Sequence, residues 1–204
     1  MKRIAFTSLS FLAALMALSC GGPSGESSSA QPPRSQPPWH EGDRVERAEL
    51  GSIINASRFG DDIYFGGQLQ PGDLALLREK GVKTVVNLRR PQEMEQLGFD
   101  EGQILQEAGM EYHLIPFGHE LPPDEQAYGQ LADLLDDPRK HPLLLHCASS
   151  NRVGYAWALF RAKQHHLGLS AAVNEGKSAG MRSPRFEAHL HNLLLPKPDD
   201  RDDR

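Results

Sequence analysis

One short apolar run, LLLH at residues 143–146, constrains the fold of this chain more than any other feature. Continuous apolar runs of this length are typical of a strand that is buried on both faces of a sheet. Apolar side chains then recur at helical spacing over 152–166, where Val153, Ala156, Trp157 and Phe160 form one stripe. A buried strand followed closely by a helix predicts an α/β fold.

The rest of the folded region alternates between strand and helix signals. We expect strands at 62–65, 83–88, 111–115 and 143–146, and helices at 71–80, within 92–108, at 123–135, at 152–166 and over 170–195, with breaks at Gly176 and Gly180. Such alternation favours parallel strands joined by helical crossovers. The fold class is therefore predicted as a single α/β domain with a central, mostly parallel sheet and helices on both faces.

Composition and charge exclude several classes of protein. The formal net charge of −5 provides no basic face for nucleic acid. No apolar stretch of about 18 or more residues follows the N-terminal segment, which excludes a polytopic membrane protein. The pairs His165-His166 and His189-x-His191 lack the spacing of zinc-binding helices. We assign no metal and no cofactor.

The N-terminal residues 1–19 have the pattern of a secretory signal, with Lys2 and Arg3 before a short apolar stretch. Small residues then precede Cys20, and this junction resembles a bacterial lipobox. The resemblance implies lipidation of Cys20 and anchoring to a membrane of the bacterial cell envelope, on the periplasmic side and at the outer membrane in a Gram-negative cell. The alternative is an ordinary signal peptide with an incidental cysteine.

Two further segments have little apolar surface to bury. Residues 20–45 are mostly Gly, Pro, Ser and Gln, which predicts a flexible linker behind the lipid-attachment cysteine. Residues 196–204 form a charged tail that we expect to be disordered. The folded domain is thus predicted to span 46–195.

The second cysteine, Cys147, directly follows the LLLH run and precedes the helix that starts near Arg152. In open α/β sheets, ligands bind beyond the carboxyl ends of strands and near helix N-termini. The intervening Ala148, Ser149, Ser150 and Asn151 are small, so their N–H groups can converge on one anion. Together with the planar guanidinium of Arg152, they predict an oxyanion site beside a thiolate nucleophile. The alternative is a buried structural cysteine.

The segment HCASSNRVG, His146 to Gly154, resembles the signature loop of cysteine-dependent phosphatases of the tyrosine and dual-specificity kind. The run IYFGGQLQPGDLALLREKGVKTVVNLR, from Ile63, is similar to the N-terminal half of their bacterial relatives, in particular the phosphatase-like domain of β-lactamase-hydrolase-like proteins. The resemblance covers about 62–165. It implies that Cys147 attacks phosphorus, Arg152 holds the phosphoryl oxygens and His146 orients the loop.

Three features depart from the usual phosphatase pattern. Four residues separate Cys147 from Arg152 where five are usual, and four is also the spacing of rhodanese-type sulfurtransferases. Val153 stands where phosphatases usually have Ser or Thr, for which Ser149 or Ser150 could substitute. The general acid is usually an Asp after the third strand. The loop FGHELPPDEQ offers three candidates instead: His119, Glu120 and Asp124.

We select Glu120 as the general acid, because Asp124 could equally serve as a helix N-terminal carboxylate. Arg89 and Arg90 follow the predicted strand at 83–88, on the same sheet edge as Cys147, and by default are solvated loop charges. The sequence favours a phosphatase whose partner is a phosphorylated substrate. The alternatives are a sulfurtransferase that carries a persulfide on Cys147 and takes a sulfur donor, or an inactive phosphate-binding module.

Overall fold

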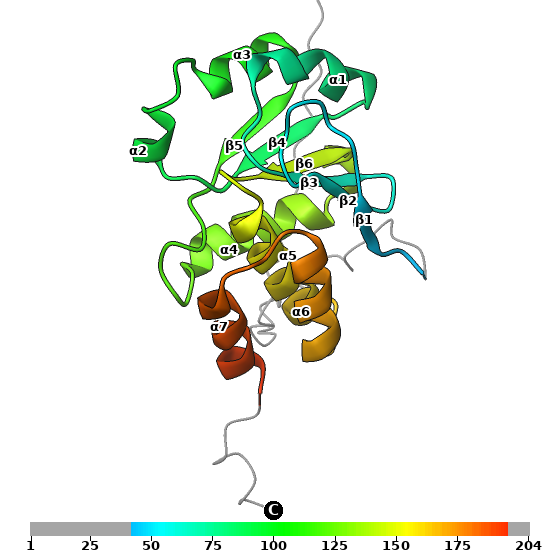
Figure 1. The fold of residues 1–204 in the computed structure, drawn as a ribbon, viewed down its shortest axis with the longest axis vertical. Helices are drawn as coiled ribbons and strands as arrows, with labels where there is room; N and C mark the ends of the chain where they lie inside the picture. Colours follow the sequence, from blue (N-terminus) through cyan, green and yellow to red (C-terminus); the bar gives the residue numbers. More distant parts are fainter. Residues whose placement is uncertain (1–41, 196–204) are drawn as a thin grey trace, which may run out of the picture. The chain divides into compact units, whose positions relative to one another are not determined.

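The computed structural model describes residues 42–195 (Figure 1). The predicted signal, Cys20, residues up to 41 of the linker and the tail at 196–204 lie outside these residues. The described residues form a six-stranded sheet in the order β1-β2-β3-β6-β4-β5. The strands are β1 (Val45–Arg47), β2 (Ser57–Phe59), β3 (Ile63–Gly66), β4 (Thr84–Asn87), β5 (Glu111–Leu114) and β6 (Leu143–His146).

The LLLH run forms β6, and all four of its residues are buried. It lies between β3 and β4 and pairs with both in parallel, and β4 pairs in parallel with β5. The predicted mostly parallel sheet is therefore confirmed. The antiparallel strands β1 and β2 extend the sheet at the β3 edge, and the sequence analysis missed both. They are only three residues each, and β1 is largely exposed, so they lack a strong apolar pattern.

Seven α-helices lie within residues 42–195. They are α1 (Leu74–Glu79), α2 (Pro91–Met94), α3 (Glu101–Glu107), α4 (Glu125–Asp136), α5 (Asn151–Gln164), α6 (Leu169–Ser178) and α7 (Pro184–Leu194). Two 3-10 turns, Pro71–Asp73 and Pro138–Lys140, precede α1 and β6. The expected helix within 92–108 is divided into α2 and α3, and the expected segment 170–195 into α6 and α7.

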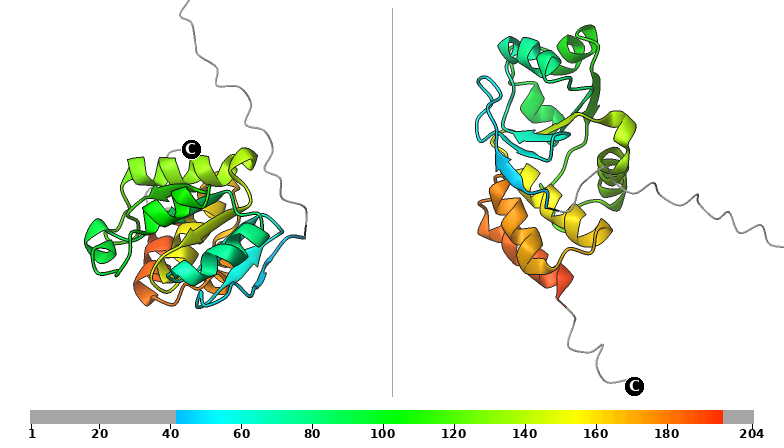
Figure 2. Two further views of the ribbon diagram at one scale, coloured as in Figure 1. Left: turned by 90° about the horizontal axis from the view of Figure 1, so that it is seen from above. Right: turned by 90° about the vertical axis from the view of Figure 1, so that its right-hand side faces the viewer.

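Helices cover both faces of the sheet, as predicted. In Figure 1, α1 and α3 lie above the sheet and α4 to α7 lie below it, and Figure 2 shows the same separation from the side. Strand side chains alternate accordingly: Leu143 and Leu145 belong to the larger apolar cluster with α4 and α5, whereas Leu144 packs with Leu77 of α1 and Leu105 of α3.

The break expected at Gly176 is wrong, because this glycine lies inside α6. A Cβ atom at Gly176 would lie 2.6 Å from the carbonyl oxygen of Gly154 in α5, and one at Gly154 would lie 2.2 Å from the Gly176 carbonyl oxygen. The two glycines therefore permit close contact between α5 and α6. Gly180, at φ +110°, does follow the end of α6, as expected of a glycine that ends a helix.

Candidate active site

The predicted anion-binding loop connects β6 to α5 at the carboxyl end of the parallel strands. Ser150 has left-handed backbone geometry, with φ +65° and ψ −2°, and is the N-cap residue of α5. Its hydroxyl donates a 2.7 Å hydrogen bond to the carbonyl of Ala179, and a Cβ atom on Gly180 would lie 2.7 Å from the Ser150 Cβ. The end of α6 thus fixes the sharp bend of the loop.

The carbonyl groups of the loop accept hydrogen bonds from outside it. The Ala148 oxygen accepts from the Gln68 N–H at 3.2 Å, and the Ser149 oxygen accepts from Asn55 Nδ2 at 3.1 Å and Arg182 Nη2 at 2.8 Å. The side chain of Asn151 accepts from the N–H of Arg182 at 2.6 Å. These contacts hold the loop in one conformation from several sides. They also leave loop N–H groups and the N-terminus of α5 to bind an anion.

Cys147 is buried, with 1% of its surface exposed. Its N–H donates to the Gly66 carbonyl of β3 at 3.3 Å, and its side chain belongs to the apolar cluster beneath α5. The sulfur also interacts with Arg152, so the predicted nucleophile and the predicted phosphate-binding arginine are neighbours in space.

Both terminal nitrogens of Arg152 bind Glu93 of α2: Nη1 donates to Oε2 at 2.9 Å and Nη2 to Oε1 at 2.8 Å. This is the two-pronged geometry with which a guanidinium binds any planar oxyanion. The hydrogen bond from Arg152 lowers the pKa of Glu93 to about 2, although burial acts in the opposite direction. Burial opposes the charge of Arg152, but Glu93 and Cys147 raise its pKa above the ordinary value.

The three acid candidates occupy different surroundings. His119 Nε2 accepts a 2.6 Å hydrogen bond from Arg152 Nη1, and burial together with Arg152 lowers the pKa of His119. Asp124 caps α4, since its side chain accepts from the Ala127 N–H at 2.9 Å. Glu120 is exposed and lines a small cavity of about 240 Å³ together with His119 and Arg90. Its role as general acid stays a prediction.

His146 points to the opposite face of the sheet from Cys147, where it enters a buried polar network. Its Nε2 lies 3.1 Å from Oε1 of Glu101, and both side chains are fully buried. Glu101 also accepts from Asn87 Nδ2 at 2.7 Å and from Gln68 Nε2. Burial raises the pKa of Glu101, but His146 and these hydrogen bonds outweigh burial and lower it overall. The network anchors the β6 end behind the loop.

Arg89 corrects a prediction. Instead of a solvated loop charge, it is only 9% exposed, and it donates to Gln68 Oε1 and, at 3.0 Å, to the Glu93 carbonyl. It therefore links the Glu101 network to the Glu93 carboxylate that holds Arg152. Arg90 is exposed as expected, and its Nε donates to Glu93 Oε2 at 3.3 Å.

The sequence analysis missed Glu93 and Glu101. Neither shows a motif with Cys147, from which they are separated by 54 and 46 positions. The only local signal is the spacing of Glu93, four residues after Arg89. This spacing suits an ion pair within one helical turn, but it does not indicate a contact with the active site.

The profile of a family described as a DSP-PTPase phosphatase fused to NAD+ kinase matches residues 44–182. The chain belongs to this family. The matched residues include β1 to α6 and the whole loop from Cys147 to Arg152. The match ends at Arg182, the residue that contacts the Ser149 carbonyl. No protein among the curated ones matches the chain.

Two solved structures show the same fold as this phosphatase-family domain. P. aeruginosa TpbA in complex with phosphotyrosine is 20% identical, with a TM-score of 0.56, and the match covers 77% of this chain and 91% of that one. The core catalytic domain of the PP-IP phosphatase SIW14 from S. cerevisiae, in complex with citrate, is 16% identical, with a TM-score of 0.56, over 75% of this chain and 93% of that one. These two structures show that the chain has the fold of such phosphatases, and the family match over residues 44–182 shows that its domain is of the phosphatase type.

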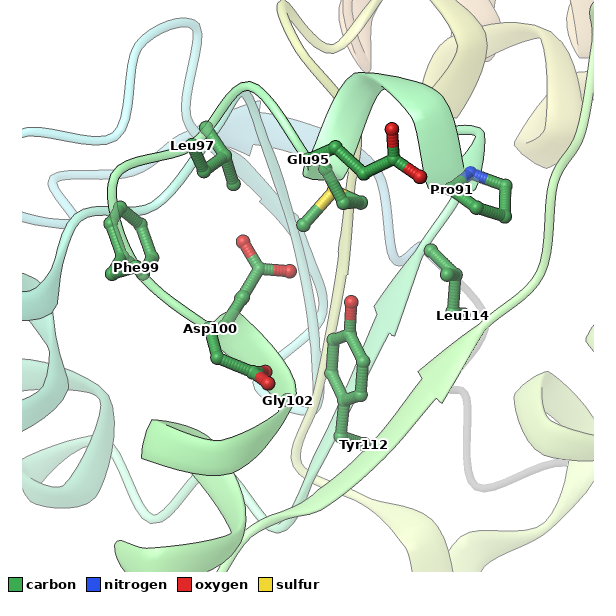
Figure 3. A pocket seen from close by; sticks show the side chains of 10 residues that line it. Pro91, Glu95, Leu97, Phe99, Asp100, Gly102, Tyr112 and Leu114 are labelled. Carbon is green, nitrogen blue, oxygen red and sulfur yellow. The ribbon is translucent and has the colours of Figure 1, made fainter.

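A second cavity of the phosphatase-family domain lies beside the Glu101 network and has a volume of about 400 Å³ (Figure 3). Leu97 and Phe99 come from the connection between α2 and α3, and Tyr112 and Leu114 come from β5. The Tyr112 hydroxyl accepts from Asn87 Nδ2 at 3.1 Å. The cavity wall thus contacts both the short helix that carries Glu93 and the residues that hold His146.

Within residues 42–195, no group of three or more His, Cys, Asp or Glu side chains is arranged to hold a metal ion. In the same residues, no helix combines the length and the apolar character that crossing a membrane requires.

Proposed function

We propose that this protein hydrolyses phosphate monoesters through a phosphocysteine intermediate on Cys147. In the first step the Cys147 sulfur attacks phosphorus, the S–P bond forms, and the P–O bond to the leaving alcohol breaks. The leaving oxygen takes a proton from the general acid, for which Glu120 is our candidate. Water then attacks phosphorus, the S–P bond breaks, and Glu120 takes the proton of the water, which gives phosphate and restores the thiolate.

The single observation that carries this proposal is the placement of Cys147 directly after β6 and of Arg152 in the first turn of α5, where the two side chains interact electrostatically. A nucleophile and a two-pronged oxyanion ligand at one helix N-terminus suit transfer of a phosphoryl group, whose three equatorial oxygens carry the charge. The N–H groups of Ala148 to Asn151 would bind the oxygens that Arg152 does not.

His146 has a supporting role in this scheme. It is fully buried with Glu101 on the opposite face from Cys147, so it orients the loop from the β6 end instead of exchanging protons with the substrate. TpbA was solved in complex with phosphotyrosine and the SIW14 core catalytic domain in complex with citrate, and both ligands are anionic, which supports an anionic substrate for this chain.

The test is hydrolysis of an aryl phosphate by the full chain in detergent, under reducing conditions. We expect turnover that vanadate inhibits, that Cys147→Ser abolishes, and that Arg152→Lys lowers about 100-fold or more because Lys lacks the planar fork. A general acid acts only when it is protonated, so Glu120→Gln should remove the corresponding step from the pH profile of kcat. A folded, reduced protein that hydrolyses no phosphate ester but forms thiocyanate from thiosulfate and cyanide would instead be a sulfurtransferase. Retained phosphate binding without either reaction would indicate a binding module.

We further propose that Cys20 is lipidated and anchors the domain to a membrane of the cell envelope through the linker up to residue 45. The lipobox-like junction and the Gly, Pro and Ser composition behind it support this proposal. Mass spectrometry of the N-terminal peptide tests it. A peptide that starts at Cys20 with the mass of attached acyl chains is expected, and Cys20→Ser should release the protein from membranes. An unmodified peptide that starts elsewhere would overturn it.

A further inference from the structure

The arginines on the β4 side of the loop all interact with one carboxylate. Arg152 binds both oxygens of Glu93, Arg90 Nε lies 3.3 Å from its Oε2, and Arg89 Nε lies 3.7 Å from its Oε1. The single negative charge of Glu93 is shared by these three guanidinium groups. Each of these three arginines therefore has a carboxylate within ion-pair distance.

Arg182 lies in the connection between α6 and α7 and contacts the loop at Ser149. Its Nη2 donates to the Ser149 carbonyl at 2.8 Å and lies 3.3 Å from Ser149 Oγ, and its Nη1 donates to the Gly180 carbonyl at 3.0 Å. These partners are neutral. Among residues 42–195, no carboxylate lies within ion-pair distance of Arg182, in contrast to the arginines near Glu93.

Three contacts on neutral atoms hold the Arg182 guanidinium in place. The main chain of this segment is held as well. The N–H groups of Arg182 and Ser183 both donate to Asn151 Oδ1, the second at 3.0 Å. A guanidinium has five N–H donors, so Arg182 keeps donors for a further ligand, and the residue is exposed. A fixed, exposed cation without a carboxylate partner, in direct contact with an anion-binding loop, is suited to a second anionic group.

We propose that Arg182 is a specificity-determining residue that binds a second phosphate or carboxylate of the substrate. The preferred substrates are then small molecules or side chains with two anionic groups, of which one is transferred to Cys147 and the other contacts Arg182. This inference rests on the proposed phosphatase function and names its substrate class. The hydrogen bond to the Ser149 carbonyl places the second anion beside the loop.

Benzene scaffolds provide matched probes for this subsite. Phenyl phosphate carries one phosphate, and the 1,2-, 1,3- and 1,4-benzene bisphosphates carry a second at increasing separation. Calorimetry with the full-length Cys147→Ser chain in detergent measures binding without turnover. We expect one isomer to bind about 10-fold or more tighter than phenyl phosphate, the usual contribution of a charge-assisted contact. A cation at a fixed position should favour one isomer, whereas a general preference for charge should raise the affinity for all three bisphosphates alike.

Two variants in the same background test the residue. Arg182→Gln should remove the preference for the favoured isomer, so that the affinity for this isomer falls by a clearly larger factor than the affinity for phenyl phosphate. Arg182→Lys should restore part of the preference. Arg185→Gln is the matched control, because Arg185 is an exposed arginine three positions further on with no hydrogen bond to the loop among residues 42–195. It should leave every affinity unchanged.

The outcomes separate this inference from the proposed function. Equal losses for phenyl phosphate and the bisphosphates in Arg182→Gln, or no favoured isomer, would show that Arg182 only supports the Ser149 carbonyl, and would overturn the inference. If the unmodified chain still hydrolyses phenyl phosphate, the proposed function stands. A favoured isomer that depends on Arg182, in a chain that hydrolyses none of the probes, would support the subsite and overturn the proposed function.

Discussion

The two faces of the sheet stabilise the same loop in different ways. Below the sheet, Cys147 lies in an apolar layer with Trp157, whose ring lies 5.0 Å from that of Phe65, and α5 and α6 approach closely at Gly154 and Gly176. Above it, at the carboxyl end of the same strand, His146 binds a buried carboxylate. The loop is therefore positioned by packing from one side and by charged hydrogen bonds from the other, and the two contributions respond to different perturbations.

The largest effect is expected from disruption of the polar face. Glu101→Leu removes the acceptor for His146, Asn87 and Gln68 and should lower the free energy of unfolding by about 3–5 kcal/mol, since it leaves buried polar partners uncompensated. Urea denaturation measures this. Glu101→Gln keeps the shape and one acceptor oxygen, so it should cost clearly less. Equal stability of Glu101→Leu and the unmodified chain would show that the polar face contributes nothing.

The apolar face is tested next by Gly154→Ala. The added Cβ would lie 2.2 Å from the Gly176 carbonyl oxygen and 2.3 Å from the Met181 nitrogen, both backbone atoms, so α5 and α6 must separate. We expect a loss of about 1–3 kcal/mol in the free energy of unfolding. Gly129→Ala in α4 is the control, because a Cβ there meets no atom within 4 Å, and it should be neutral or slightly stabilising. Equal effects of the two would contradict this packing.

Mild acid should affect the apolar face first. His141, next to β6, is buried, and burial lowers its pKa below 6.5, while attraction from Asp62 partly opposes this. The folded state keeps the ring neutral, so its stabilising contribution is present above about pH 6.5 and is lost as pH falls below it, because the unfolded chain takes up the proton. Tm measured from pH 7 to 5 should fall less in His141→Gln. An unchanged slope would contradict this. His119 and His189, whose pKa values are also lowered by burial, should keep part of the slope.

Stronger acid should lower Tm through the ion pair between Glu93 and Arg152, and we expect this to be the smallest of the four effects. The pKa of Glu93 is lowered to about 2 by its hydrogen bond with Arg152, so its contribution is present above the ordinary value of 4.5 and is lost as pH falls toward 2. Tm measured from pH 5 to 3 should therefore fall less steeply in Glu93→Gln than in the unmodified chain. Glu95→Gln, on the neighbouring turn, is the control and should keep the full slope. If both variants keep it, the ion pair does not contribute to stability.

The comparison also shows what kind of feature sequence reasoning finds. The LLLH strand, the helix α5 and the loop from Cys147 to Arg152 follow from local patterns, and each lies where it was expected. The single apolar stripe expected for α5 is wrong, because every residue from 153 to 160 is buried. Gly176 and Arg89 were misjudged because neighbours far away in the sequence decide their roles: Gly154 across the α5–α6 contact, and Gln68 with Glu93 around the guanidinium. The short strands β1 and β2 were missed for the same reason, since pairing defines them: β2 pairs with β3, and β1 pairs with β2.

The sequence by itself determined the α/β class, the mostly parallel sheet and the position of the nucleophile-and-arginine loop, because periodicity and strand-to-helix order act over neighbouring residues. Only the tertiary structure decided which partners surround that loop. The strand order places β6 beside β4, so the segment after β4 meets the loop at the carboxyl end of the strands. The packing of α6 on α5 brings the segment after α6 to the same loop. Glu93, Glu101 and Arg182 reach the site through that convergence, which no local spacing of residues encodes.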